Sequence, residues 1–174
     1  MRIRRALAVT ACAAVVATAI PAAAHDHRPP RTRLTSRDAS QAGQQSSYCW
    51  TSAGDEPGEA TGICVDYIFS FPRAERAHAG AMASIIFKTA NKPTSLDLSY
   101  WRDVDENGPK GNERRIDYSL RAVRADGEIV AYRARFRLPE RRGHMYIYVF
   151  GTWDDQDAGG GSQDSSWTFH LRLR

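Results

Sequence analysis

The chain has 174 residues, of which 42% are hydrophobic, and residues 48–174 are enough for one domain of ordinary size with a single core. Its formal net charge of +4 includes Arg2, Arg4 and Arg5, so the residues after position 24 carry only about +1. This small charge gives no support to a nucleic-acid partner, and no apolar run after position 24 is long enough to span a bilayer.

Residues 1–24 have the features of a secretory signal peptide. Arginines precede an apolar run over residues 6–20, and Pro21 and three alanines follow it. We therefore expect a secreted, extracellular protein that loses this segment. The alternative is that Cys12 is lipidated, because residues 9–12 resemble a lipoprotein processing site. The apolar stretch before Cys12 is shorter than usual, which favours the signal peptide.

Removal of the first 24 residues leaves two cysteines, Cys49 and Cys64. An even pair in an oxidising compartment indicates a disulfide bond. We expect Cys49 and Cys64 to form a disulfide that closes a segment of about 16 residues and stabilises the fold by roughly 3 kcal/mol.

Residues 25–47 have the composition of a flexible tail. They contain two adjacent prolines, three glutamines, several serines and four arginines, with almost no large apolar side chains. Such a segment cannot bury enough surface to order itself, so we expect it to be a solvated linker. Its alternative role is a weak electrostatic tether to an anionic wall polymer.

Residues 48–174 are expected to form one all-β domain. Apolar and polar residues alternate over residues 63–71 and again over 167–173, which is typical of strands with one buried face. Glycine, proline and asparagine separate these segments. The pattern predicts about eight strands in an antiparallel β-sandwich, immunoglobulin-like or jelly-roll. We expect strands near residues 48–51, 63–71, 81–89, 95–102, 114–124, 128–138, 144–152 and 167–173.

The hairpin around Asp126-Gly127 predicts a basic surface. A two-residue turn would divide the apolar residues between the two faces, so burial favours a three-residue loop over residues 125–127. Leu120 then lies opposite Tyr132, and every apolar side chain faces the core. The other face carries the arginines of both strands: Arg115, Arg121, Arg133, Arg135 and Arg137.

This arginine-rich face has two interpretations. Guanidinium groups offer bidentate hydrogen bonds to phosphate, sulfate or carboxylate groups, so Arg121, Arg133 and Arg135 are candidate contacts for an anionic ligand. The alternative is the ordinary solvated face of an antiparallel sheet, which long polar side chains also suit.

A second candidate site is the acidic loop that follows Trp153. Asp154, Asp155 and Asp157 precede three glycines, and clustered carboxylates in a flexible loop suit Ca²⁺. Sugar rings stack on aromatic faces while their hydroxyls form hydrogen bonds, so we expect a surface Trp153 to contribute to a carbohydrate site. We expect Trp50 and Trp167 in the core instead.

Residues 103–108 match the first half of a calcium-binding EF-hand loop. Arg114 stands where the last ligand of such a loop would be, so a polar hairpin loop is favoured here.

The sequence contains no recognisable catalytic motif. It has neither H-E-x-x-H nor G-x-S-x-G, and it lacks a glycine-rich phosphate loop. A copper site of His25 with His144 or His170 is disfavoured, because a flexible stretch follows His25. We expect a monomeric, non-catalytic binding domain acting at the cell surface or on an extracellular polymer, a polysaccharide or an anionic wall polymer. A protein-interaction or inhibitor domain is the alternative, and a hydrolase without a known motif comes third.

Overall fold

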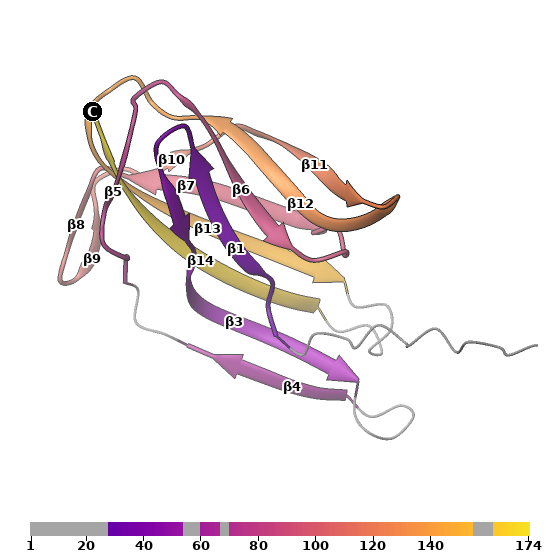
Figure 1. The fold of residues 1–174 in the computed structure, drawn as a ribbon. Coiled ribbons are helices and arrows are strands. Elements are labelled where there is room, and N and C mark those ends of the chain that lie inside the picture. Colours follow the sequence, from indigo (N-terminus) through magenta and orange to yellow (C-terminus); the bar gives the residue numbers. More distant parts are fainter. Residues whose placement is uncertain (1–27, 54–59, 67–69, 155–161) are drawn as a thin grey trace, which may run out of the picture.

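The computed structural model of the protein describes residues 28–53, 60–66, 70–154 and 162–174. Two β-sheets, almost entirely antiparallel, pack face to face, and these residues contain no helix (Figure 1). The predicted all-β sandwich is confirmed. In the described part of the chain no helix is long and apolar enough to cross a membrane.

Five strands form the first sheet: β1 (Arg31–Ser36), β2 (Ser40–Ala42), β6 (Met82–Lys88), β11 (Tyr118–Ala125) and β12 (Glu128–Arg137). Their order across the sheet is β11-β12-β6-β1-β2. Every neighbouring pair is antiparallel, and β6 lies at the centre with β12 on one side and β1 on the other.

Seven strands form the second sheet: β3 (Gln44–Ala53), β4 (Ala60–Val65), β5 (Glu75–Ala77), β7 (Ser95–Trp101), β10 (Arg114–Arg115), β13 (Gly143–Asp154) and β14 (Ser162–Leu173). The order is β10-β7-β13-β14-β3-β4, and β5 pairs in parallel with β14. A separate hairpin consists of β8 (Asp103–Asp105) and β9 (Gly108–Lys110).

The core lies between the sheets and is rich in aromatic residues. The ring of Phe87, on β6, lies 5.7 Å from Trp167 and 6.5 Å from Trp153, centroid to centroid. Trp50 packs 5.6 Å from Trp153. All four side chains are buried, so the prediction that Trp50 and Trp167 belong to the core is confirmed.

The prediction of a flexible tail over residues 25–47 is wrong for residues 31–47, which form β1, β2 and the start of β3. In β1, Thr32 and Leu34 point into the core while Arg31 and Arg33 are exposed. Backbone pairing with β6 and one fully buried leucine order this segment, and average composition does not reveal either. Residues 1–27, with the predicted signal peptide and Cys12, lie outside the described residues.

The polar residues of this segment also have a structural role, shown best by Gln41. Strand β3 pairs with β14 as far as Thr168, and β5 pairs with it only from Leu171 onward. In the gap, Gln41 Oε1 accepts a hydrogen bond from the His170 backbone nitrogen at 2.9 Å. Its Nε2 donates to the Arg73 carbonyl oxygen at 2.8 Å. A buried side-chain amide thus replaces a missing strand partner.

The turn between β11 and β12 differs from the prediction. Asp126 and Gly127 form a two-residue turn with φ of 51° and 87°, the left-handed pair that a type I′ turn requires. The register then shifts between Val123 and Arg124, so Leu120 lies opposite Ala134, not Tyr132. This bulge returns the apolar side chains to one face. The prediction of a three-residue loop is therefore wrong. The apolar residues share one face as predicted, but the extra residue, Val130, lies in strand β12 and not in the turn.

Two predicted strands are divided or shortened. The segment 114–124 contributes β10 to the second sheet and β11 to the first, so Arg115 leaves the predicted arginine face and forms an ion pair with Asp97. The predicted strand 63–71 ends at Val65 in β4, and residues 67–69 lie outside the described ranges. The division of segment 114–124 adds one strand, and β1, β2, β5, β8 and β9 were not expected, so the described residues contain fourteen strands where about eight were expected.

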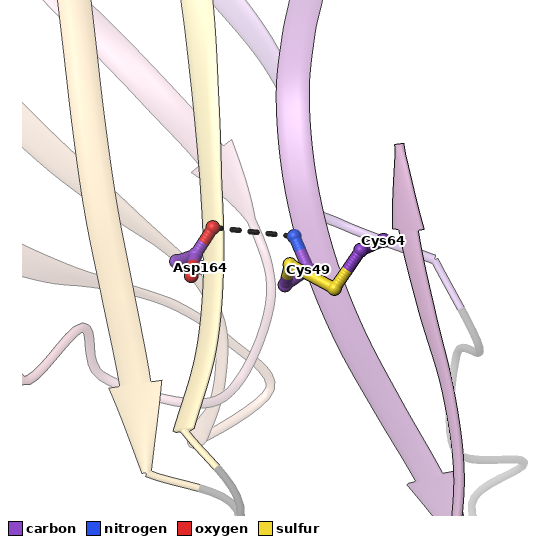
Figure 2. The surroundings of a disulfide bond; sticks show 3 residues. All are labelled: Cys49, Cys64 and Asp164. Carbon is purple, nitrogen blue, oxygen red and sulfur yellow. Dashed lines mark hydrogen bonds between the residues drawn. A yellow bond between two sulfur atoms is a disulfide. The ribbon is translucent and has the colours of Figure 1, made fainter. Parts of the chain in front are cut away.

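The predicted disulfide is confirmed. Cys49 on β3 and Cys64 on β4 lie directly opposite each other and are bonded (Figure 2). The Cys49 backbone nitrogen also donates a hydrogen bond to the Asp164 carboxylate at 3.2 Å, which links β3 to β14. The disulfide therefore fastens β4 to β3, and the hydrogen bond to Asp164 together with the β3–β14 ladder joins this outer hairpin to the central part of the sheet.

The packing of β1 predicts the effect of Leu34→Ala. We expect this substitution to lower the free energy of unfolding by about 2–5 kcal/mol, the range for a leucine truncated in a packed core. Arg37→Ala, in the exposed turn after β1, should change it by less than about 0.5 kcal/mol. Urea unfolding of both variants measures this. Equal stabilities would mean that residues 31–36 do not pack on the core.

Candidate functional site on the outer face of the five-stranded sheet

The predicted site around Trp153 is not assembled at the surface. The Trp153 side chain is only 2% exposed, and its indole Nε1 donates a hydrogen bond to the Asn91 carbonyl oxygen at 3.2 Å. Strand β13 continues in register through Asp154, so Trp153 follows the inward alternation of Val149 and Gly151. The prediction that Trp153 is a surface residue is therefore wrong.

The aspartates of this loop give no assembled metal site in the described residues. Asp154 is exposed at the end of β13, and Asp155 and Asp157 fall outside the described ranges. Across the described part of the chain, no three histidine, cysteine, aspartate or glutamate side chains gather as metal ligands. The calcium prediction for Asp154, Asp155 and Asp157 stays a prediction.

The second calcium candidate forms a hairpin. Asp105 accepts a hydrogen bond from the Asn107 backbone nitrogen at 2.9 Å and pairs with Lys110 at 2.8 Å. The hydrogen bond from Lys110 lowers the pKa of the Asp105 carboxyl. The carboxylate that would ligate an ion is thus engaged by a lysine, as the favoured hairpin interpretation implies.

The predicted arginine face, in contrast, is assembled. Strand β12 alternates buried Ala134 and Phe136 with exposed Arg133 and Arg135. The buried residues meet the core, so the arginines must point to the outer face of the five-stranded sheet. On β11, Arg121 lies directly opposite Arg133, and residues that pair across an antiparallel ladder share a face.

Two parallel rows of side chains cross this outer face. In the first, which we call the arginine row, Arg121, Arg133 and Arg33 flank Ile86 of β6. The second, the hydroxyl row, has one residue from each strand of the sheet. In order across the sheet, its residues are Ser119, Arg135, Ser84, Thr35 and Ser40.

A hollow of about 250 Å³ lies on this face. Its walls come from the three strands β1, β6 and β12. The lining residues are Thr35, Ser36, Met82, Ala83, Ser84, Arg133 and Arg135. The hydroxyl oxygens of Thr35 and Ser84 are 3.1 Å apart, so the two side chains share a hydrogen bond at the centre of the hydroxyl row.

Within the described part of the chain, the arginines of this face form no ion pair. Among the described residues, no carboxylate lies within ion-pair distance of Arg33, Arg121, Arg133 or Arg135. Like charges directly opposite each other on a sheet are destabilising, and Arg121 and Arg133 are such a pair. A fold selected for stability alone would favour an acidic or neutral residue at one of these positions.

Half of this face was predictable from the sequence, and half was not. Arg121, Arg133 and Arg135 were predicted, whereas Arg33, Thr35 and Ser84 were not. The signal was present in the alternation of Arg31, Thr32, Arg33 and Leu34. It was overlooked because the surrounding composition indicated a tail.

A second cluster lies on the seven-stranded sheet, where His144 and His170 meet. His144 Nδ1 and His170 Nε2 are 2.8 Å apart, and the Tyr146 ring stacks on His170 at 4.1 Å. His170 Nδ1 donates to the Pro72 carbonyl oxygen at 3.2 Å. Burial lowers the pKa of His170; the Pro72 carbonyl opposes this shift and the neighbouring His144 adds to it. His25, the third residue of the disfavoured copper site, is outside the described residues.

Comparison with known proteins gives no guide to these sites. No protein-family model, no curated protein and no solved structure matches the chain. The function must therefore be inferred from the chemistry of the faces themselves.

The opposed arginines predict a gain in stability when either charge is removed. Arg121→Gln and Arg133→Gln should each raise the free energy of unfolding by about 0.2–1 kcal/mol, toward the lower end because water screens both groups. The double variant should gain less than the sum of the two, since one substitution already relieves the repulsion. Urea unfolding at low and high salt measures this. A loss of stability in both single variants would contradict the repulsion.

His170 predicts a loss of stability in acid. Its folded pKa lies below the ordinary value of about 6.5, so the unfolded chain binds more protons in this range. The stabilisation is therefore present above about pH 6.5 and is lost as the pH falls through the lowered pKa. His170→Gln should reduce the difference in unfolding free energy between about pH 7.5 and pH 5. An unchanged difference would show that another group is responsible.

Proposed function

We propose that the protein is a secreted, non-catalytic binding domain that attaches to an anionic extracellular polymer through the outer face of its five-stranded sheet. The observation that carries this proposal is the arginine row, in which Arg121 and Arg133 lie side by side, Arg33 follows on the far side of Ile86, and none of the three has a carboxylate partner in the described chain. The hollow beside the row offers a place for an anionic group.

The chemistry of the face suits this ligand. Arginine remains charged at all physiological pH values and forms bidentate hydrogen bonds with phosphate, sulfate and carboxylate groups. A polymer repeats its anionic groups, so several weak contacts add up to a firm attachment. The arginines are held on the strands of a packed sheet, and this reduces the ordering that binding requires.

Two further features support an extracellular setting. The Cys49–Cys64 disulfide is of a kind that persists in oxidising compartments, and the basic and apolar pattern of residues 1–24 is typical of a secretory signal. A neutral polysaccharide is a weaker candidate, because the tryptophan on which that prediction depended, Trp153, is buried.

Charge reversal tests the proposal. The double variant Arg133→Glu/Arg135→Glu should no longer be retained on immobilised heparin or purified cell wall, whereas the unmodified protein should be retained and should elute with salt. The control is Arg141→Glu/Arg142→Glu, which changes the net charge equally at an exposed turn outside this face. Thermal unfolding confirms that each variant is folded.

The control variant should remain bound. An equal loss of retention in both double variants would mean that net charge alone determines binding, and it would contradict a defined site. No retention of the unmodified protein on any anionic polymer would reject the proposal and would favour the protein-interaction alternative.

A further inference from the structure

We infer that the hollow on this face selects tetrahedral oxyanions, the phosphate or sulfate esters of a polymer, over carboxylates. This inference rests on the proposed function and names the chemical class of its ligand. The observation behind it is that hydroxyl donors and guanidinium donors line the same hollow, while the charge alone would serve any anion.

The donors come from several directions. Arg133 and Arg135 reach the hollow from β12, Ser84 from β6, and Thr35 from β1, with Ser36 directly after it. The pairing of Thr35 with Ser84 uses only one of their two hydroxyl protons, so one proton remains to donate to a ligand.

The shape of the anion decides which ligand uses these donors best. A carboxylate has two oxygens in one plane, and one bidentate arginine can engage both of them at once. A phosphate or sulfate group has oxygens that point in several directions and can accept from arginines and hydroxyls together. Donors spread over three strands therefore favour the tetrahedral group.

The remaining wall of the hollow indicates an ester in place of a free ion. Met82 lines the hollow, and its side chain is 38% exposed, one of three large exposed apolar side chains in the described chain. A methionine gives no hydrogen bond to an inorganic ion but packs well against carbon atoms. It provides contact for the carbon skeleton to which the phosphate or sulfate is attached.

Dextran derivatives provide the test, because one polymer carries each anionic group. The full chain is titrated with dextran sulfate, dextran phosphate and carboxymethyl dextran of equal length and charge density. We expect the tetrahedral derivatives to bind roughly tenfold more tightly, a ratio that one hydrogen bond to a charged group accounts for. Comparison of sulfate with phosphate shows which ester the hollow prefers.

A double variant and a single control locate the selectivity. Thr35→Val/Ser84→Ala removes two hydroxyls from the hollow and should weaken binding to dextran sulfate and dextran phosphate more than binding to carboxymethyl dextran, so that the preference is lost. The control Ser119→Ala removes a hydroxyl of the same row outside the hollow and should keep the preference.

The outcomes separate this inference from the proposed function. Equal binding of all three dextrans by the unmodified protein overturns the selectivity and leaves polyanion binding intact. A preference that survives Thr35→Val/Ser84→Ala overturns the role of the hollow. No binding to any dextran derivative overturns the proposed function as well. The titration of the unmodified protein with the three dextrans needs no substitution, so it tests the selectivity even if a variant fails to fold.

Discussion

The contact of Phe87 with Trp153 and Trp167 joins the two sheets, and the rest of the structure depends on it. Phe87 belongs to β6, the middle strand of the five-stranded sheet. Once this residue faces the tryptophans, the ladders to β1 and β12 fix which side chains of those strands turn inward. Burial of large aromatic rings is among the strongest contributions that a core of this size can obtain.

The outer face is a consequence of this inward packing. A strand exposes every second residue, so burying Leu34, Phe87 and Phe136 presents Arg33, Ile86 and Arg135 to water. The arginines need no special backbone to be aligned, because the ladder aligns them. The ladder does not explain why these positions hold arginine. The repulsion between Arg121 and Arg133 lowers the stability of the fold, so stability does not account for two arginines there.

Alternation was sufficient to predict an all-β sandwich, the disulfide followed from the cysteine count, and burial correctly placed Arg121, Arg133 and Arg135 on one face. Residues 31–47 were misjudged because their order comes from partners far along the chain, such as the pairing of Leu34 with Ile85. Trp153 was predicted at the surface because strand β13 was expected to end at residue 152. Pairing with β14 extends β13 to Asp154, and Trp153 then continues the inward alternation of the strand. The bulge at Val130 was not predicted, because an extra residue either in the turn or in strand β12 places the apolar side chains of the hairpin on the same face.

Strand β14 occupies the centre of the seven-stranded sheet, although it is the last strand along the described chain. Its partners β13 and β3 lie on either side, and β3 is separated from it by more than half of the sequence. The sheet therefore cannot close until residues 162–173 are available. Bringing together strands so distant in the sequence costs loop-closure entropy before their contacts form, which is typical of slow folding. Until that strand is made, β13 and β3 expose the backbone groups that β14 pairs with, so an incomplete chain holds the seven-stranded sheet as two separate parts.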